Sequence, residues 1–209
     1  MPSAIKLIVG LGNPGPEHLM TRHNAGFWFI DVLAAKYSLV FRSESRFRSE
    51  VCRLSTIDHD CYLCKPMDFM NRSGQPVQAI AGFYKISINE ILVVHDDIDI
   101  EPGVVRFKQG GGHGGHNGLR DIIEKMGSNE FNRLRIGVGH PGSSSDVVNY
   151  VLERAPAAEE ELIMQSIAEV MEMIPHILTG EFQKVMQELH SSEKSKNKSE
   201  KGTDDENND

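Results

Sequence analysis

Long apolar runs and paired cysteines are scarce in this sequence of 209 residues, and each scarcity excludes a class of protein. No stretch approaches the roughly 20 apolar residues that a membrane-spanning helix needs. The first residues do not have the layout of a signal peptide. Cys61 and Cys64 have the spacing of half a zinc or redox site, but no second pair completes it. We therefore expect a cytoplasmic protein without a membrane partner, in which these cysteines and Cys52 pack in strands.

Positive charge is in short supply only towards the C-terminus. Residues 155–190 hold one Lys and seven Glu, and residues 191–209 hold four Lys and six acidic residues. These two segments account for the net charge of −8, so residues 1–154 are neutral as a whole. The acidity does not exclude a nucleic-acid partner, because a local basic patch matters more than the sum.

Strand-like and helix-like segments alternate along most of the chain, which predicts a single α/β domain. We expect this domain over residues 1–190, as a mixed twisted sheet with helices on both faces and a helical C-terminal segment. The polar residues 191–209 are expected to form a disordered tail. Predicted strands cover residues 5–9, 48–56, 61–65, 91–94, 104–108 and 134–138. Predicted helices cover 25–37, 73–84 with Ser73 as its cap, 119–126, 145–152, 157–178 with a break at Pro175, and 182–189.

Six of the nine residues 110–118 are glycine, and a predicted helix follows directly. Such a run is typical of backbone that takes positive φ or approaches another surface closely. We expect it to bring Asn117 to a helix N-terminus, where free N–H groups can meet a ligand. The alternative is a flexible surface linker. His113 and His116 lie in the loop, but no carboxylate shares their spacing, so we expect no metal site.

His23 and Asp96 lie where two predicted elements meet loops. Asp96 follows the apolar run 91–94, so it belongs to the carboxyl end of a buried strand, where α/β sheets form ligand crevices. A carboxylate that holds one nitrogen of an imidazole leaves the other nitrogen as a general base. Considered alone, His23 could instead be a structural polar residue that forms hydrogen bonds at the N-terminus of the following helix.

Three asparagines, Asn13, Asn71 and Asn117, each lie in a loop beside a glycine or a helix start. Singly each is a typical cap or turn residue. Together with His23 and Asp96 they can line one pocket, where neutral amides bind a carbonyl or stabilise an oxyanion. The sequence lacks the G-x-S-x-G elbow of a serine nucleophile, so the chemistry indicated is base-assisted attack by water.

Two further patterns concern phosphate. Residues 10–15 match G-x-G-x-x-G, but two prolines interrupt the motif and the predicted helix starts late, which argues against dinucleotide binding. Basic residues flank the glycine run and favour a phosphate clamp over solvated strand ends. They are Arg106, Lys108, Arg120, Arg133 and Arg135.

Taken together, the motifs resemble the bacterial-type peptidyl-tRNA hydrolase family over residues 5 to 190. The matching segments, in the family order, are LIVGLGNPG (7–15), TRHNAG (21–26), FMNRSG (69–74), HDDID (95–99), GGGHGGHNG (110–118) and RLRIGVGHPG (133–142). The resemblance implies hydrolysis of the ester bond between peptide and tRNA, a metal-free and cofactor-free monomer, and peptidyl-tRNA as the partner.

The resemblance also implies roles for residues at matching positions. His23 corresponds to the catalytic base, Asp96 to the residue that keeps it basic, and Asn13 to the amide that discriminates blocked from free aminoacyl groups. Asn71 and Asn117 correspond to substrate-binding and water-positioning amides, Phe69 to a contact of the tRNA end, and Lys108 and Arg135 to the cations at the tRNA 5′-phosphate. His18 stands where many members have a substrate-contacting tyrosine, so stacking is expected there without the phenol.

Two other functions are open from the residues alone. A non-enzymatic RNA-binding relative, such as the plant organelle splicing factor of this fold, would keep the basic face without turnover. A dinucleotide-dependent oxidoreductase would bind NAD.

Overall fold

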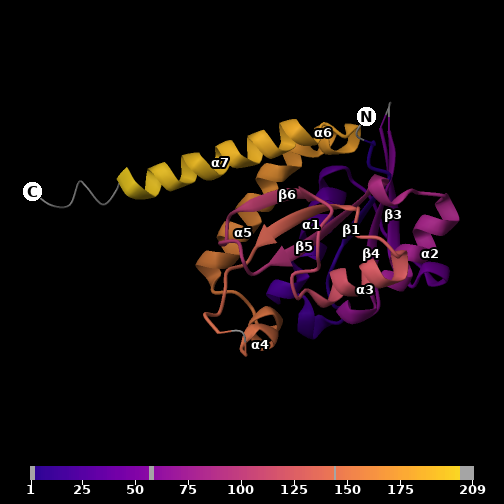
Figure 1. Ribbon diagram of the computed structural model, residues 1–209, viewed down its shortest axis with the longest axis horizontal. Coiled ribbons are helices and arrows are strands. Elements are labelled where there is room, and N and C mark those ends of the chain that lie inside the picture. The colour runs from indigo at the N-terminus through magenta and orange to yellow at the C-terminus, as the bar shows by residue number, and fades with distance from the viewer. Residues whose placement is uncertain (1–2, 57–58, 144, 203–209) are drawn as a thin grey trace, which may run out of the picture.

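The protein folds around one twisted sheet, with helices on both of its faces (Figure 1). The computed structural model describes residues 3–56, 59–143 and 145–202. In this part of the chain seven strands form the sheet, in the order β2-β3-β4-β1-β5-β7-β6. The strands are β1 Leu7–Gly10, β2 Arg42–Glu44, β3 Ser49–Ser55, β4 Asp60–Pro66, β5 Ile91–Asp97, β6 Val105–Gln109 and β7 Asn132–Gly137.

The four central strands, β4, β1, β5 and β7, run parallel to one another. The outer pairings β2–β3, β3–β4 and β6–β7 are antiparallel, so the sheet is mixed as the sequence predicts. Strand β5 is the apolar run of the sequence and is buried along nearly its whole length. Because the parallel strands end at one edge of the sheet, the loops that follow them meet there.

The helices divide between the two faces. They are α1 Ala25–Lys36, α2 Gly74–Tyr84, α3 Asn117–Met126, α4 Val147–Leu152, α5 Ala157–Val170, α6 Ile174–Thr179 and α7 Phe182–Gly202. Apolar side chains of α1, α5, α6 and α7 pack with Ile8 and Leu92 in one core. Those of α2 and α3 pack with Leu7 and Val93 in the other. Successive side chains of one strand thus point to opposite faces of the sheet and pack in different cores, as expected for a β-strand.

A pair of glycines brings α1 against the sheet just where the site forms. A Cβ on Gly26 would lie 2.4 Å from the carbonyl oxygen of Val94, and one on Gly10 would lie 2.3 Å from the carbonyl oxygen of Gly26. Only glycine permits this approach of helix and strand backbones. It sets the short 3-10 helix Arg22–Asn24, which precedes α1, beside the end of β5.

The cysteines are all buried in strands, as predicted: Cys52 in β3, and Cys61 and Cys64 in β4. Burial raises the pKa of each thiol, that of Cys52 to about 11 and that of Cys64 to about 12. These cysteines pack as small apolar groups.

Two local predictions need correction, and one strand was not predicted. Ser73 does not cap α2 through its side chain; its hydroxyl donates to the carbonyl of Met70, and Asp121 of α3 accepts the N–H of Gly74 instead. The predicted helix 157–178 is broken earlier than Pro175, because a 3-10 turn, Met171–Met173, separates α5 from α6. Strand β2 was not predicted, since its residues are polar and pair at an edge.

Helix α7 extends into the segment 191–209 that is predicted as a disordered tail, continues to Gly202 and projects beyond the sheet (Figure 1). Two contacts near residue 191 favour continuation: Ser192 donates to Glu169, and Arg106 of β6 pairs with Glu193. Lysine and glutamate are also good helix formers. Residues 203–209 of the predicted tail lie outside the described residues.

Candidate active site

A cavity of about 620 Å³ opens where the parallel strands end. Its walls come from the loops after β1 and β4, the end of β5, the glycine loop (residues 110–116) and α4. Of the residues predicted for the site, the lining contains Asn13, His23, Phe69, Asn71, Lys108, Asn117 and Arg135. Asp96 lies behind His23, and His18 is not part of the lining. The structure thus brings most of the predicted residues together.

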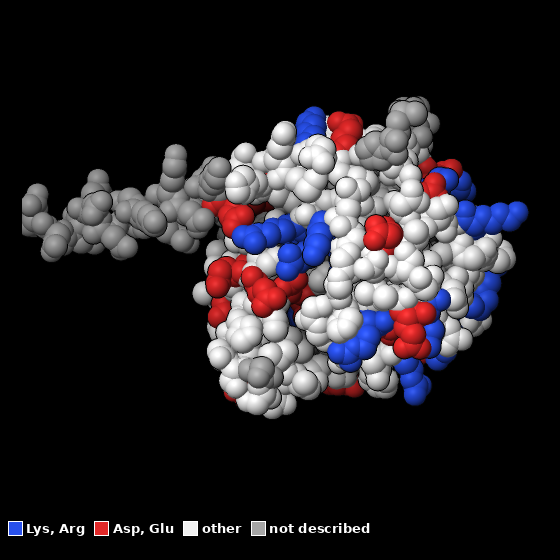
Figure 2. Space-filling model, in the orientation of Figure 1, with Lys and Arg blue, Asp and Glu red and all other residues white. Residues whose placement is uncertain are grey.

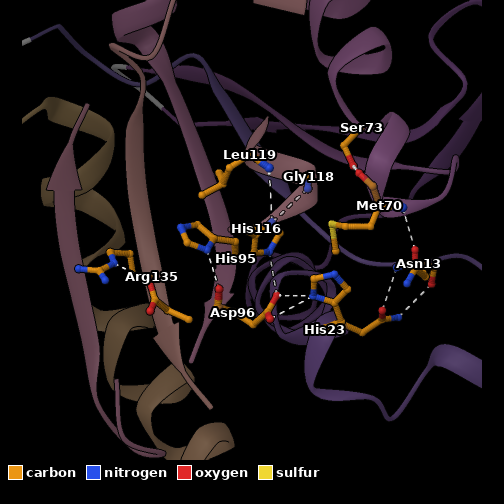
Figure 3. A network of polar contacts seen from close by, with 12 residues as sticks. Asn13, His23, Met70, Ser73, His95, Asp96, His116, Gly118, Leu119 and Arg135 are labelled. Atoms are coloured by element: carbon orange, nitrogen blue, oxygen red, sulfur yellow. Dashed lines mark hydrogen bonds and ion pairs between the residues drawn. The ribbon is translucent and has the colours of Figure 1, made fainter. Parts of the chain in front are cut away.

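His23 and Asp96 form a buried pair in the site (Figure 3). Nδ1 of His23 lies 2.9 Å from Oδ1 and 3.0 Å from Oδ2 of Asp96, and both residues are buried. Burial alone would lower the pKa of His23, but the charge and hydrogen bond of Asp96 outweigh it and raise the pKa above 6.5. Asp96 stays ionised because both neighbouring histidines lower the pKa of its carboxyl against the effect of burial. The Nδ1–H of His23 therefore points to Asp96, and Nε2 is left to act as a base.

A second histidine shares the same carboxylate. Nε2 of His116 lies 3.0 Å from Oδ1 of Asp96, and the His116 and His23 rings are 4.9 Å apart between centroids. His116 therefore has a carboxylate partner, although no carboxylate shares the spacing of the loop histidines in the sequence. The partner comes from β5, 20 residues away in the chain, so spacing within the loop could not reveal it.

His23, Asp96 and His116 could in principle ligate a metal ion, because their ligand atoms lie within 4.8 Å of one another. However, Nδ1 of His116 caps α3 by accepting the N–H groups of Gly118 at 3.2 Å and Leu119 at 3.4 Å. An imidazole that accepts at Nδ1 carries its proton on Nε2, the atom that faces Asp96. A metal-ligating histidine normally donates its second ring N–H instead. The arrangement suits a hydrogen-bonded trio better than a metal site.

Asn13 is held in one orientation by backbone and side chain. Its Oδ1 accepts the N–H of Met70 at 2.8 Å, while Asn24 brackets its backbone, accepting its N–H at 2.8 Å and donating to its carbonyl at 3.0 Å. With Oδ1 engaged, the Nδ2 group is left as the donor that Asn13 offers to the cavity. Sequence reasoning missed Asn24, although it follows His23 directly in the predicted motif.

The other two amides lie at the rim of the cavity. Asn117 is the first residue of α3, as predicted from the glycine run, and its Oδ1 accepts a hydrogen bond from Arg120 at 3.1 Å. Asn71 belongs to the 3-10 helix Met70–Arg72 after β4 and is exposed. Both can therefore reach a ligand in the cavity without a change of backbone.

Phe69 forms an exposed part of the wall, with 59% of its surface accessible. His18 stands edge-on to it, with ring centroids 6.4 Å apart. Glu17 lies 3.7 Å from Nε2 of His18. His18 thus reaches the cavity only through Phe69, which supports a role in shaping that wall.

Three of the predicted basic residues, Lys108, Arg133 and Arg135, line the cavity, and they differ in whether their charged groups are already engaged. Figure 2 shows basic side chains over β6, bordered by acidic ones. Lys108 is exposed and forms no ion pair among the described residues, and Arg135 keeps part of its guanidinium free beside Asp97, whose Oδ2 it contacts at 2.7 Å. Arg106 is paired with Glu193, and Arg133 is buried.

None of the helices in the described part of the chain combines the length and apolar character that crossing a membrane requires.

Comparison with known proteins agrees with the geometry. The profile of a family described as peptidyl-tRNA hydrolase matches residues 7–199. A peptidyl-tRNA hydrolase of Neisseria gonorrhoeae is 50% identical over 191 residues, which are 91% of this chain and 100% of that protein. One of Pseudomonas putida is 50% identical over 90% of this chain and 98% of its own length. The crystal structure of peptidyl-tRNA hydrolase from Acinetobacter baumannii superposes with a TM-score of 0.86 at 46% identity, covering 88% of this chain and 94% of that one.

Proposed function

The chain belongs to the peptidyl-tRNA hydrolase family and hydrolyses peptidyl-tRNA, and from this premise we propose that His23 is the base that activates the attacking water. The observation that carries the proposal is the contact of 2.9 Å between His23 Nδ1 and Asp96, which leaves Nε2 of His23 as the basic atom in the lining of the cavity.

In this mechanism water attacks the carbonyl carbon of the ester as Nε2 of His23 takes up a proton. Asp96 stabilises the imidazolium that forms, because the carboxylate is buried and ionised. The tetrahedral intermediate then collapses with cleavage of the bond between the carbonyl carbon and the ribose oxygen. The imidazolium returns its proton to that oxygen, which releases the peptide and free tRNA.

Asn71 and Asn117 bind the substrate and orient the water beside His23. Their side chains are neutral, line the same cavity and are accessible from it. Amide donors preorganised around a carbonyl can stabilise the negative charge that develops on its oxygen. Phe69, with His18 behind it, provides the surface on which the tRNA end stacks.

Asn13 distinguishes a blocked from a free amino group. The Nδ2 donor that it presents can bond the carbonyl of a peptide group, whereas a free α-ammonium is itself a donor and carries a charge. The N–H of Met70 keeps the amide from turning to present its oxygen instead, and Asn24 fixes the Asn13 backbone from which the amide extends. The substrate preference thus follows from the direction of one hydrogen bond.

Lys108 and Arg135 bind the 5′-phosphate of the tRNA. They line the cavity from the adjacent strands β6 and β7, and the guanidinium of Arg135 is oriented by Asp97. An oriented guanidinium and a free ammonium form a suitable phosphate clamp.

We further propose that residues 1–190 form the single catalytic domain and that the enzyme works as a cytoplasmic monomer. Support for the single domain comes from the continuous sheet and from the two cores on its opposite faces. Light scattering of the purified protein tests the monomer, and cell fractionation tests the location.

The experiment that tests the mechanism compares hydrolysis of N-acetyl-aminoacyl-tRNA with that of the unblocked aminoacyl-tRNA, for the parent and His23→Ala. We expect the parent to hydrolyse the blocked substrate preferentially, and His23→Ala to lose at least about 100-fold in kcat, the scale of a lost general base. Unchanged circular dichroism shows that the variant is folded. Turnover near the parent's in His23→Ala removes His23 from the mechanism.

A further inference from the structure

Arg133 contributes to the cavity lining, but its guanidinium is bound to the glycine loop. Arg133 lies on β7 and is 2% exposed. Its Nη1 donates to the carbonyl of Gly112 and its Nη2 to the carbonyl of Gly111. Two N–H donors that Arg133 could otherwise offer to a phosphate ligand are therefore used within the protein. This placement separates Arg133 from Lys108 and Arg135, with which it forms a single cluster in the sequence.

Among the described residues Arg133 has no carboxylate within ion-pair distance, although its charge is buried. Its guanidinium stands 4.7 Å over the ring of Phe131, and its Nε has no hydrogen-bond partner in that part of the chain. Burial lowers the pKa of Arg133, the neighbouring Arg135 lowers it further, and Glu130 acts in the opposite direction. Burying such a cation is costly unless it is hydrogen-bonded. The loop carbonyls are the groups that compensate for its burial.

The glycine loop is held at its ends, where the N–H of Gly110 donates to the carbonyl of Phe131 and His116 contacts Asp96, but its middle has few other contacts among the described residues. Gly111 has φ of +108° and Gly115 of +85°, a region that only glycine occupies readily. Around Gly112, Gly114 and Gly115 no atom lies within 4 Å of where a Cβ would be, so packing does not fix the backbone there. The bonds from Gly115 N and His116 N both end on His113, which belongs to the loop itself.

Lys108 rests against the same stretch of loop. A Cβ on Gly111 would come within 2.8 Å of its Nζ, so the ammonium lies directly against the Gly111 backbone. The loop then leads into His116, which contacts Asp96, and Asn117, which begins α3. The segment anchored by Arg133 therefore determines where three groups of the site lie.

We propose that Arg133 is a positioning residue, whose two hydrogen bonds to Gly111 and Gly112 fix the glycine loop and through it His116, Asn117 and Lys108. The inference rests on the proposed function, in which the last two bind substrate. Arg133 acts on the reaction without touching the substrate. Loss of the Arg133 side chain should therefore lower kcat, by displacing the groups that stabilise the transition state, more than it weakens the binding of tRNA.

The test compares Arg133→Met, Arg133→Lys and the control Arg53→Met, which removes an exposed strand arginine paired with Asp60 away from the cavity. We expect kcat to fall on the order of 10- to 100-fold in Arg133→Met, as for a catalytic group misplaced by about 1 Å. The salt dependence of KM and the response to the tRNA 5′-phosphate should persist. Hydrogen exchange of backbone amides 111–115 should quicken in Arg133→Met, less so in Arg133→Lys, and not in Arg53→Met.

Two results overturn the inference. One is unchanged exchange of the loop amides in a folded Arg133→Met. The other is an unchanged kcat together with a flattened salt dependence of KM, which makes Arg133 a phosphate ligand. If Arg133→Met does not fold, Arg133→Lys decides, since an ammonium keeps the charge but cannot form the same planar fork. Failure of the His23 mechanism shows separately in His23→Ala and leaves the exchange measurement valid.

Discussion

Oδ1 of Asn13 accepts the backbone N–H of Met70 at 2.8 Å, so a residue after β1 is fixed by the loop after β4. The contact couples the two loops that flank one side of the cavity. It also determines which end of the Asn13 amide faces the cavity, because the carbonyl end is already engaged. In the role that we propose for Asn13, recognition of the peptide group would thus depend on a backbone N–H that does not itself touch the substrate.

Replacing Asn13 should alter selectivity more than the overall fold. In Asn13→Ala we expect the ratio of kcat/KM for blocked over unblocked aminoacyl-tRNA to fall by about tenfold, because one buried hydrogen bond contributes about 1–3 kcal/mol. Asn13→Asp should lower the ratio further, since a carboxylate attracts the α-ammonium. Parallel assays on both substrates measure the ratio. A ratio equal to the parent's in both variants would refute the role of Asn13.

The pH profile should report on the pairing of His23 with Asp96. In the parent, kcat/KM should rise with pH through a pKa above 6.5, because Asp96 stabilises the protonated imidazole, which is inactive as a base. Asp96→Asn removes the negative charge beside His23 but keeps the burial that lowers the pKa of His23. The rising part of the pH profile of kcat/KM should therefore move to lower pH. The plateau should fall by about 100-fold or more as the base loses support. A rising part that stays in place would show that the titrating group is not His23.

His116 should matter to both the reaction and the stability of α3. His116→Ala removes a donor to Asp96 and the N-terminal cap of α3, so we expect a loss in kcat smaller than that of His23→Ala. The free energy of unfolding should fall by about 1 kcal/mol, as for other lost caps. His116→Gln can accept at one end and donate at the other and should recover part of both. Urea denaturation and single-turnover rates measure the two effects, and equal losses in kcat for the Ala and Gln variants would contradict this role.

The phosphate clamp should appear in the salt dependence. In the double variant Lys108→Ala/Arg135→Ala we expect KM to rise and its dependence on ionic strength to flatten, while kcat stays comparatively intact. The variant should also respond little to removal of the tRNA 5′-phosphate, which the parent should sense. Lys85→Ala, at the end of α2 and outside the cavity lining, is the control. A double variant that still distinguishes the two substrates as the parent does would place the clamp elsewhere.

The parts of this fold that were predictable are those in which a local pattern carries the information. The apolar run 91–94 identifies a central strand, and the glycines before Leu119 identify a helix start at Asn117. The pairing of His23 with Asp96 followed from placing both residues at the carboxyl edge of the sheet, although they are 73 residues apart.

What escaped prediction depends on contacts that no local pattern encodes. His116 reaches Asp96 because the start of α3 lies beside the end of β5, and the guanidinium of Arg133 is engaged because loop carbonyls bind it. In sequence, Arg133 and Arg135 are equivalent strand residues on the same side of β7. The two residues differ in burial, since Arg133 lies under the glycine loop and Arg135 is partly exposed at the rim of the cavity.

The burial of Cys52, Cys61 and Cys64 has a practical consequence for spectroscopy. Thiolates are the species that react with maleimides, and raised pKa values keep all three of these thiols protonated near neutral pH. The three native cysteines should therefore not react with a maleimide label under these conditions. A single cysteine introduced at an exposed position near the cavity, such as Val148, can carry a fluorophore without removal of the native ones. Fluorescence from that one position can then follow the arrival and departure of tRNA in real time.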